Sequence, residues 1–489
     1  PSSEGREFIS IAAILMEEDG VLRLDDPVRK YFPKLPEWSK NVTLWDLLNH
    51  RSGFVDEWAE MMLTQGAMSN RFDLSEFLNL LYRQPNPSVE PGKGYMYSNS
   101  DFGLLRLILE KASGKNLSDW LKQRVFDPLK MFSTRMQDNS LDIVPNNATV
   151  YMAVREKMYQ MQPAQKTSPG GNYFILTNAD DLERWSAAQS DSSTDVAKAT
   201  ARLLANVRIV PVKDHHYVFG QSYRKFNGET VVFHEGVNGF NYLTRVPAKG
   251  LAVITIGNLN RTGFAYQNNS IVEYLLTKPG QPQPPDPPLP QILIKPISVP
   301  KQDLKRYAGR YLWQDQSGYE SYLPGRKTSD FVIDGDVLKC RNCAAELSSL
   351  IPVGKALFYF KDQDNIGYQI EFSQPARSAR MQAEVRFSDG FPPIKLQRES
   401  VEIWRPSKYE LSRFRGKYYS KHLDYYWTLE LNKEGQLVIK RPTVADTVID
   451  PDGLNQFHLI IQGSSSGGGS DGWMLFHKDK NGKITHFTV

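Results

Sequence analysis

The stretch REFISIAAILMEEDGVLRLDDPVRKYFP, residues 6–33, is the most informative part of this 489-residue chain. It contains the nine-residue run FISIAAILM, which is apolar except for one serine. We expect a helix over residues 7–19 that ends at Gly20, because glycine is common just beyond a helix. A membrane-spanning helix needs about 20 apolar residues. The run therefore predicts a buried helix of a globular domain, and no transmembrane segment is expected.

The composition is ordinary for a soluble globular protein, with 40% hydrophobic and 23% charged residues. At about 150 residues per domain, the length suggests about three domains. The formal net charge is only +4, and no run of lysine and arginine stands out. Nucleic acid is therefore not expected as a partner.

The pattern of helices and strands changes along the first 278 residues. Two further helices are expected over residues 42–50 and 101–113, the second ending at Gly114. Short runs rich in β-branched and aromatic residues follow, separated by turn residues, and they predict antiparallel strands over 217–226, 229–236, 240–247 and 251–258. Helices followed by strands indicate an α/β or α+β domain with an antiparallel central sheet.

A proline-rich segment, residues 279–300, separates this domain from the rest, since nine of its 22 residues are proline. After it, LKRYAGRY at 304–311 is echoed 107 residues later by LSRFRGKY at 411–418. We therefore expect domains at 1–278, 301–405 and 406–489, the last two being small all-β meander barrels. A single irregular β-sandwich is the alternative for the second half.

No metal or cofactor is expected. Cys340 and Cys343, in CRNC, are the only cysteines, and a redox pair or half of a zinc site would be their functional interpretation. A zinc site needs further Cys or His ligands at regular spacing. We favour two ordinary positions on either side of a turn, which export would allow to form a disulfide. His215 and His216 are adjacent, so on a strand they point to opposite faces.

Three short motifs contain residues suited to acyl transfer: SEGR at 3–6, YSN at 97–99 and HEG at 234–236. A nucleophilic serine needs a proton acceptor and donors for the oxyanion. A tyrosine beside cationic groups can act as a base. Each motif also has a plainer interpretation, in which Ser3 caps a helix, Tyr97 and Asn99 form a turn and an N-cap, and His234 is an ordinary strand residue.

The context of these motifs resembles the serine β-lactamase, D,D-peptidase and D-aminopeptidase superfamily. Similar segments occur in the same order over residues 1 to about 275, and they are REFISIAAILMEEDGVLRLDDPVRKYFP, LWDLLNHRSGF, YMYSNSDFGLLRLILEKASGKNLSDWLKQRVFDPLKM, SPGGNYFILTNADDLERW and FHEGVNGFNYLTRVP. The resemblance implies a β-lactamase-like domain followed by two β-barrels. The His-x-Gly motif and the barrels are most similar to the D-aminopeptidase and esterase branch.

The family motifs imply roles for the matching residues. Ser3 falls at the nucleophile, Tyr97 at the base and Asn99 at the amide that binds substrate.

The third family motif falls on a predicted strand, where His234 and Gly236 match it. The oxyanion hole would use the backbone N–H of Ser3 and one from a residue near Val237 or Asn238.

The lysine of the family's Ser-x-x-Lys motif is replaced by Arg6. Lysine can lose its proton when it is buried, whereas arginine stays charged, so Arg6 cannot accept the proton of Ser3. Arg6 can still hold Tyr97 as a phenolate, which leaves Tyr97 as the only base. A general base contributes about 100- to 10,000-fold to a rate, and the substitution predicts a severe loss of activity.

The family also has a pair of strands before the nucleophile helix. Here either these strands lie in a segment before residue 1, or the sheet has an exposed edge. Two functions stay open: a serine hydrolase acting on D-amino-acid peptides, amides or esters, and a non-catalytic relative that binds peptidoglycan-like or acyl ligands. Tyr97, Asn99 and His234 favour the hydrolase, and Arg6 favours the binding protein. The resemblance implies a small-molecule or peptide substrate and a periplasmic or extracellular location.

Overall fold

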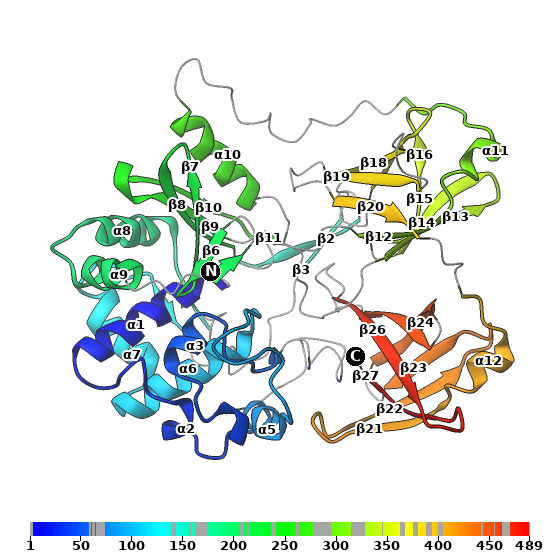
Figure 1. Ribbon diagram of the computed structural model, residues 1–489. Coiled ribbons are helices and arrows are strands. Elements are labelled where there is room, and N and C mark those ends of the chain that lie inside the picture. The colour runs from blue at the N-terminus through cyan, green and yellow to red at the C-terminus, as the bar shows by residue number, and fades with distance from the viewer. Residues whose placement is uncertain are drawn as a thin grey trace. The chain divides into compact units, whose positions relative to one another are not determined.

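The computed structural model (Figure 1) consists of two compact units. Unit 1 comprises Pro1–Met152, Met161–Pro284 and Lys421–Asp424, and unit 2 comprises Ala153–Gln160, Pro285–Ser420 and Tyr425–Val489. The residues that the structure describes are 3–57, 60, 64, 74–137, 143–155, 158–161, 175–205, 210–212, 215–235, 241–260, 264–277, 295–313, 328–344, 346–361, 367–374, 380–387, 394–399, 404–441, 444–453, 455–461 and 470–488.

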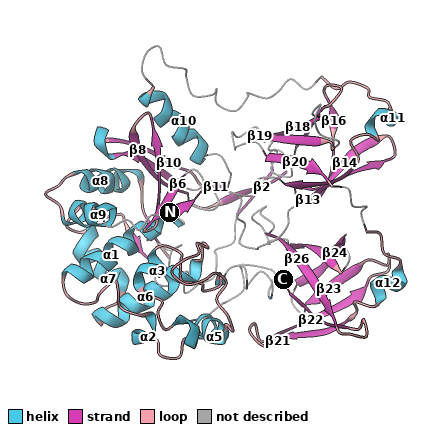
Figure 2. Ribbon diagram, in the orientation of Figure 1, coloured by secondary structure: helices cyan, strands magenta, loops and turns pink. Residues whose placement is uncertain are grey.

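Unit 1 contains most of the described helices (Figure 2). They are α1 (Arg6–Glu18), α2 (Val28–Tyr31), α3 (Leu44–Leu48), α5 (Leu74–Arg83), α6 (Asn99–Ser113), α7 (Leu117–Leu121), α8 (Ala179–Ser190), α9 (Asp195–Ala205) and α10 (Phe264–Leu276). Short 3-10 turns are η1 (Ser3–Gly5), η2 (Glu37–Ser39) and η4 (Pro247–Lys249), and η3 (Lys122–Phe126) is a single π-helical turn. The three helices expected from the sequence are present within two residues of their predicted bounds, and Gly114 ends α6 in the left-handed conformation, with φ 66°.

The central sheet of unit 1 is antiparallel throughout, with the strand order β10-β9-β8-β7-β6-β5. Its strands are β5 (Val210–Val212), β6 (His215–Val218), β7 (Gln221–Phe226), β8 (Glu229–Glu235), β9 (Asn241–Val246) and β10 (Leu251–Ile256). Smaller sheets are formed by β1 (Arg135–Met136) with β4 (Ile175–Leu176), and by β2 (Tyr151–Arg155), β3 (Met158–Met161) and β11 (Leu259–Asn260).

Helices cover both faces of this sheet, because its strands alternate apolar residues between the faces. On β9, Tyr242 and Val246 belong to the same apolar cluster as Val272 of α10. Leu243, on the other face of β9, belongs to the core that contains α1. Helices α8 and α9 pack on each other, α8 also contacts β10, and α9 contacts α1 (Figure 1). The main core of unit 1 therefore lies around α1, on the face of the sheet that carries Leu243.

Helix α1 is buried on nearly all sides, as its apolar run predicts. Every residue from Arg6 to Met16 is buried, and the ring of Phe8 packs on Trp185 and Phe126. A helix that is apolar around its circumference belongs in a core, and each buried leucine or isoleucine contributes about 1.5–3 kcal/mol. Within the described part of the chain, no helix has the length and apolar character that a membrane crossing requires.

Two tight hairpins connect β6, β7 and β8. In each, two residues with positive φ separate the paired strands: Phe219 and Gly220 (52° and 78°), then Asn227 and Gly228 (48° and 84°). Two-residue hairpin turns favour this conformation because it matches the twist of the strands. Asparagine and glycine adopt it readily, so the second turn follows directly from its sequence.

Unit 2 is built almost entirely of strands. After α11 (Lys301–Leu304), one sheet has the order β15-β14-β13-β12-β20-β19-β18-β17-β16, and after α12 (Lys408–Ser412) a second is a meander from β21 to β27. The strands are β12 (Gly309–Trp313), β13 (Thr328–Asp334), β14 (Val337–Ala344), β15 (Glu346–Ser349), β16 (Ile351–Pro352), β17 (Leu357–Lys361), β18 (Gly367–Ser373), β19 (Gln382–Phe387), β20 (Ile394–Arg398), β21 (Gly416–Ser420), β22 (Tyr425–Leu431), β23 (Leu437–Arg441), β24 (Val444–Gly453), β25 (Gln456–Ile461), β26 (Ser470–Lys478) and β27 (Ile484–Thr488). Both sheets are nearly closed barrels, so the expected fold class is confirmed. The predicted domain bounds stay predictions, and most of the proline-rich segment lies outside the described residues.

The sequence echo corresponds to a repeated local structure. Each copy begins with a short helix and continues into the first strand of its sheet. The hydroxyl of Tyr311 donates to the carbonyl oxygen of Tyr307, and the hydroxyl of Tyr418 donates to that of Phe414, both over 3.0 Å. Two copies of one hydrogen bond at matching positions support a relationship between the two sheets.

Cys340 and Cys343 lie on one strand, β14, so the expectation that they flank a turn is wrong. The pairing of β14 with β15 shifts register between Cys340 and Ala344. Such a bulge changes where successive side chains point. Cys340 is disulfide-bonded, and Cys343 is the only other cysteine in the chain.

Candidate active site

Ser3 lies in η1, the turn that leads into α1, and its side chain is fully buried. The N-cap of α1 is Gly5, so the plainer interpretation of Ser3 as a helix cap is wrong. Its Oγ has no hydrogen-bond partner among the described residues, an arrangement that costs about 1–3 kcal/mol for a buried hydroxyl. Ser10 on α1 is buried with a similarly unpaired hydroxyl. Burial and an unpaired hydroxyl therefore do not distinguish Ser3 from Ser10. Ser3 is a candidate nucleophile because of the residues around it.

The guanidinium of Arg6 joins three of the predicted motif residues. Its Nη2 donates to Oδ1 of Asn99 over 2.5 Å, and its Nη1 lies 3.4 Å from the carbonyl oxygen of Ser3. Its Cζ lies 4.5 Å from the centroid of the Tyr97 ring and 5.3 Å from that of Phe102. Such cation–π contacts are strongest when the cation is desolvated, and Arg6 is fully buried. Ser3, Tyr97 and Asn99 therefore meet around one permanent positive charge.

Asn99 connects this charge to a buried carboxylate. It is the first residue of α6, after the N-cap Ser98, so the interpretation of Asn99 as an N-cap is wrong. Its Nδ2 donates to the two carboxylate oxygens of Asp56 over 2.9 and 3.0 Å. Arginine can only donate and an ionised carboxylate can only accept, so these partners define the orientation of the amide. The row Arg6–Asn99–Asp56 thus pairs a buried cation with a buried anion through an amide.

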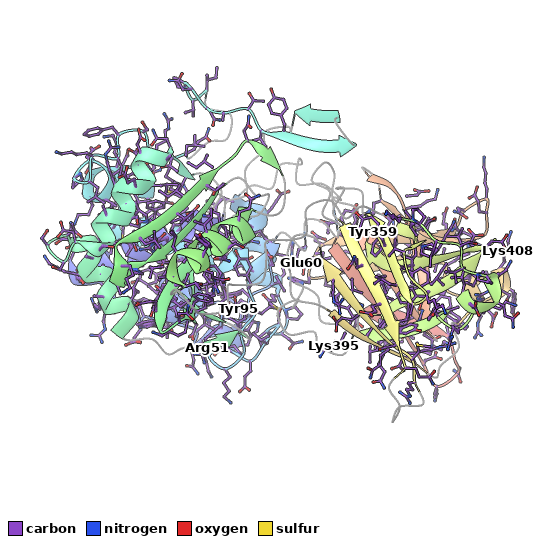
Figure 3. The ribbon with its side chains drawn as sticks, turned by 90° about the horizontal axis from the view of Figure 1, so that it is seen from above. Arg51, Glu60, Tyr95, Tyr359, Lys395 and Lys408 are labelled. Carbon is purple, nitrogen blue, oxygen red and sulfur yellow. The ribbon has the colours of Figure 1, made fainter. Side chains whose placement is uncertain are left out.

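His234 is buried on β8, as the strand pattern predicts. Its Nε2 lies 3.4 Å from the hydroxyl of Tyr217, which in turn lies 3.2 Å from Nε2 of His50. The rings of Tyr97, Tyr217 and Tyr95 surround His50, with centroids at 4.4, 4.9 and 6.2 Å (Tyr95 is labelled in Figure 3). Aromatic contacts therefore connect the tyrosine motif with His234.

Sequence reasoning assigned no role to His50, Tyr217 or Asp56. The segment LWDLLNHRSGF drew attention through its family resemblance, but nothing in it indicates which residue His50 contacts. Tyr217 belongs to the stretch 217–226, whose pattern predicts a strand and indicates no function. The contacts of these residues depend on tertiary packing, which local patterns do not encode.

Glu4 follows Ser3 directly and is also buried, with both carboxylate oxygens unpaired among the described residues. Burial raises the pKa of its carboxyl from 4.5 to about 7, and nearby Glu7 adds to the rise, while Arg245 opposes it. The sequence did not indicate Glu4 as a functional group, because a buried glutamate before a helix and an exposed one in a surface turn look the same in the sequence. Its protonation therefore changes near neutral pH, next to the candidate nucleophile.

A network of buried polar groups anchors the start of α1 to the sheet. Oε1 of Glu7 accepts hydrogen bonds from Arg245 over 2.7 Å, from Gln189 over 2.5 Å and from Gln221. These partners come from β9, α8 and β7. The network holds the helix turn that carries Arg6 against strands on either side of β8.

Gly220 allows the β6–β7 turn to approach Arg6 closely. A Cβ at this position would lie 2.8 Å from Cβ of Arg6 and 2.9 Å from its carbonyl carbon. Its φ of 78° also favours glycine. The hairpin turn therefore packs directly against the backbone and Cβ of Arg6.

The third motif is only partly described. Gly236, Val237 and Asn238, the predicted substrate-binding and oxyanion residues, lie outside the described residues, as does the SPGGNYF part of the fourth similar segment. The side chains of His215 and His216 also lie outside them. Within the described ranges, no group of three or more His, Cys, Asp or Glu side chains is arranged to hold a metal ion.

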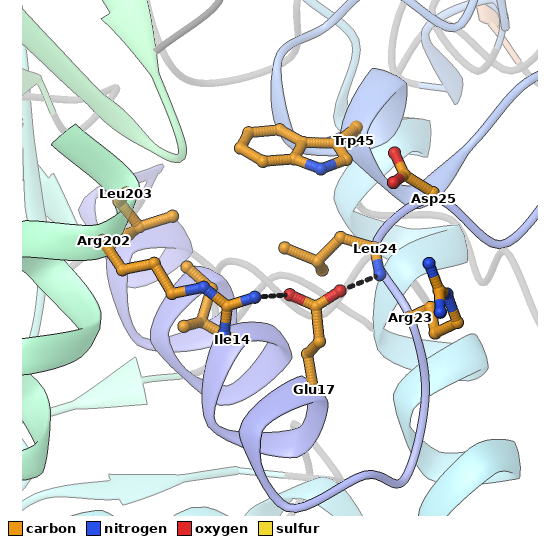
Figure 4. Close-up of a pocket in the computed structure, with 8 residues that line it drawn as sticks. All are labelled: Ile14, Glu17, Arg23, Leu24, Asp25, Trp45, Arg202 and Leu203. Atoms are coloured by element: carbon orange, nitrogen blue, oxygen red, sulfur yellow. Dashed lines mark hydrogen bonds and ion pairs between the residues drawn. The ribbon is translucent and has the colours of Figure 1, made fainter. Parts of the chain in front are cut away.

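A separate pocket of about 330 Å³ lies at the other end of α1 (Figure 4). It is lined by Ile14, Glu17, Arg23, Leu24, Asp25, Trp45, Arg202 and Leu203. The carboxylate of Glu17 lies at its centre, where it accepts hydrogen bonds from Arg202 and from the backbone N–H of Leu24. At 1.5 Å per residue, the length of α1 puts its two ends about 20 Å apart, so this pocket is distinct from the surroundings of Ser3.

Comparison with known proteins identifies the class. The family profile described as Beta-lactamase matches residues 7–276, more than half of the chain. The chain belongs to the Beta-lactamase family, and its relatives include penicillin-binding proteins and D-aminopeptidases.

Individual relatives are similar over parts of the chain. Penicillin-binding protein 4* of Bacillus subtilis (strain 168) is 33% identical over 142 residues, which are 29% of this chain and 31% of the relative. The D-aminopeptidase of Brucella ovis is 27% identical over 193 residues, 39% of this chain and 36% of the relative. The match to this chain thus spans about a third of the length of each of these curated relatives.

A solved structure has a similar fold. The octameric penicillin-binding protein homologue from Pyrococcus abyssi is 20% identical, with 81% of this chain and 87% of that chain covered and a TM-score of 0.51. At this identity the likeness concerns the fold alone.

Proposed function

We propose that this chain is a serine hydrolase that forms an acyl-enzyme on Ser3 and cleaves D-amino-acid-containing peptides, amides or esters. One observation carries the proposal: Ser3, Tyr97 and Asn99, from distant parts of the sequence, meet around the guanidinium of Arg6. The similarity to a D-aminopeptidase supports the substrate class. A non-catalytic chain has no need to keep these three residues together.

In the proposed reaction, Oγ of Ser3 attacks the carbonyl carbon of the substrate while the phenolate oxygen of Tyr97 takes the hydroxyl proton. The tetrahedral intermediate then expels the amine or alcohol, which receives that proton from Tyr97. Water attacks the resulting ester on Ser3, again with Tyr97 as the base, and releases the acid. Arg6 stays protonated throughout, so its role is to stabilise the negative charge on Tyr97.

A second candidate function rests on Arg6 itself. Arginine has a pKa above about 12 and does not act as a base, and here its guanidinium is engaged by Asn99 and stacked near Tyr97. This arrangement favours a chain that binds peptidoglycan-like or acyl ligands without turning them over.

Mass spectrometry of the full chain after incubation with a fluorophosphonate or a penicillin-type probe tests the proposal. We expect one covalent adduct on Ser3, which is absent in Ser3→Ala and present in Ser10→Ala, the matched control for a buried, unpaired serine of the same region. Amides of D- and L-amino acids then test the substrate class, with faster release expected from the D-amides.

The same experiment separates the two candidate functions. Labelling of Arg6→Lys but not of the wild type would contradict the hydrolase proposal and support a binding protein whose chemistry was lost at one residue. An adduct on a serine other than Ser3 would overturn the assignment of the nucleophile.

A further inference from the structure

A row of buried hydrogen-bond contacts runs from helix α6 to the third motif. It joins Oδ2 of Asp101 to Nδ1 of His50 over 3.1 Å, Nε2 of His50 to the hydroxyl of Tyr217 over 3.2 Å, and that hydroxyl to Nε2 of His234 over 3.4 Å. All four side chains are buried, with His50 and Asp101 fully inaccessible. The proposed catalytic step uses neither His50 nor Tyr217, so the row requires a separate explanation.

One backbone group determines which atoms donate and which accept along this row of hydrogen bonds. The N–H of Ser98 donates to Nδ1 of His50 over 3.2 Å. A backbone N–H can only donate, so Nδ1 of His50 is an acceptor and the ring proton lies on Nε2. Burial, together with the positive charge of Arg6 and nearby His234, holds the pKa of His50 well below its usual range, and the ring is neutral.

The direction then extends to both ends. Asp101 faces the same nitrogen, whose lone pair would repel an ionised carboxylate, so the carboxyl carries the proton and shares that lone pair with the Ser98 N–H; burial raises the pKa of this carboxyl well above its usual range. At the other end, Nε2–H of His50 donates to the oxygen of Tyr217. The single proton of Tyr217 is then available to Nε2 of His234, because burial also raises the pKa of the Tyr217 hydroxyl and keeps it protonated.

We propose that His50 and Tyr217 are positioning residues that hold His234 as a neutral imidazole with its proton on Nδ1. The row thereby defines which nitrogen of His234 is a donor in the candidate active site. The ring of His50 also packs against the ring of Tyr97, with centroids 4.4 Å apart, so the same residue contacts both motifs. The role of this row in catalysis rests on the proposed function. The tautomers of His50 and His234 do not depend on it.

Nitrogen-15 NMR of the full chain with labelled histidine tests the proposal, because it distinguishes protonated from unprotonated ring nitrogens. At neutral pH we expect His50 with its proton on Nε2 and His234 with its proton on Nδ1. In Tyr217→Phe, which removes only the hydroxyl, His234 becomes a mixture of tautomers. Acylation of Ser3 falls about tenfold, as expected when a single neutral hydrogen bond is lost.

Tyr223→Phe is the matched control. The hydroxyl of Tyr223, on the adjacent strand β7, donates to Gln221 and makes no hydrogen bond to either histidine. Both tautomers should stay unchanged in this variant. A proton on Nδ1 of His50, or a His234 signal that does not respond to Tyr217→Phe, would overturn the proposal. Absence of acylation at Ser3 with the expected tautomers would instead overturn only the proposed function.

Discussion

The guanidinium of Arg6 and the side-chain amide of Asn99 form a direct hydrogen bond of 2.5 Å between the start of α1 and the start of α6. The same amide donates to Asp56, so the positive charge at the family's lysine position is paired within a buried row. Buried charges are stable only when they are paired and hydrogen-bonded. Arg6 is therefore integrated into the site, and substituting it changes both stability and chemistry.

Arg6→Lys should raise the rate of Ser3 acylation about 100-fold, because a buried lysine can give up its proton and serve as a general base. The rate of adduct formation with a penicillin-type probe measures the effect. Arg106→Lys on α6, where the arginine pairs with Glu110 within the same helix, is the control and should leave the rate unchanged. Equal rates in wild type and Arg6→Lys would mean that proton transfer to residue 6 does not limit acylation.

Asn99→Ala should lower the free energy of unfolding by about 3–5 kcal/mol, because it removes the hydrogen bonds of the amide to the charged side chains of Arg6 and Asp56, each worth about 1.5–3 kcal/mol. Urea denaturation provides the measurement. Asn116→Ala is a suitable comparison, since Asn116 caps α7 through one hydrogen bond and its loss should cost only about 0.5–2 kcal/mol. Similar losses in the two variants would contradict the bridging role of Asn99.

Gly220→Ala should destabilise the protein and slow acylation, because the new Cβ would collide with Arg6. Gly228→Ala is the matched control: it has a similar φ of 84° and the same place in the next hairpin, but open space around it. The control should show only backbone strain, about 1–2 kcal/mol. Thermal unfolding and acylation rates of both variants test this difference, and equal effects would exclude a specific contact with Arg6.

The stability of the protein should depend on the protonation of Glu4. Its pKa of about 7 in the folded state exceeds the ordinary value of 4.5, so the folded protein holds this proton more tightly than the unfolded chain does. The resulting stabilisation is fully present below pH 4.5 and is lost as the pH rises to about 7. The shift corresponds to about 3 kcal/mol.

Urea denaturation at several pH values compares wild type with Glu4→Gln, which cannot ionise. The stability difference between them should change by about 3 kcal/mol between about pH 4.5 and 8, with the wild type losing stability relative to the variant. Glu18→Gln, at an exposed carboxyl near the end of α1, should give a curve parallel to wild type. A parallel curve for Glu4→Gln as well would show that the Glu4 carboxyl does not titrate differently on folding.

The sequence predicted those parts of the fold that local patterns encode. The apolar run of α1, the left-handed glycine after α6 and the Asn227–Gly228 turn all act within a few residues, and the structure has each of them. Interpretations that depended on a particular neighbour were wrong in detail. Ser3 does not cap α1, and Cys340 and Cys343 lie on one strand, whose pairing shifts register between Cys340 and Ala344, an irregularity with no clear sequence signal.

The candidate site was predictable only where family motifs mark it. Ser3, Tyr97 and Asn99 were recognised from their context, and their roles remain predictions. The partners of His50 could not be predicted from the sequence, since Asp101 and Tyr217 lie 51 and 167 residues away from it along the chain. Contacts over such separations depend on how the helices pack against the sheet, and one sequence alone does not specify them.

The tyrosine bonds at the start of the two barrels bear on the history of the gene. Tyr311 and Tyr418 each fasten the first strand of a sheet to the carbonyl four residues earlier, within the matching stretches LKRYAGRY and LSRFRGKY. A duplication followed by divergence would leave this pattern, with the anchoring bond kept while the strands around it changed. The repeated octapeptide and the repeated hydrogen bond are thus the features by which a duplication of one module in the second half of the chain would be recognised.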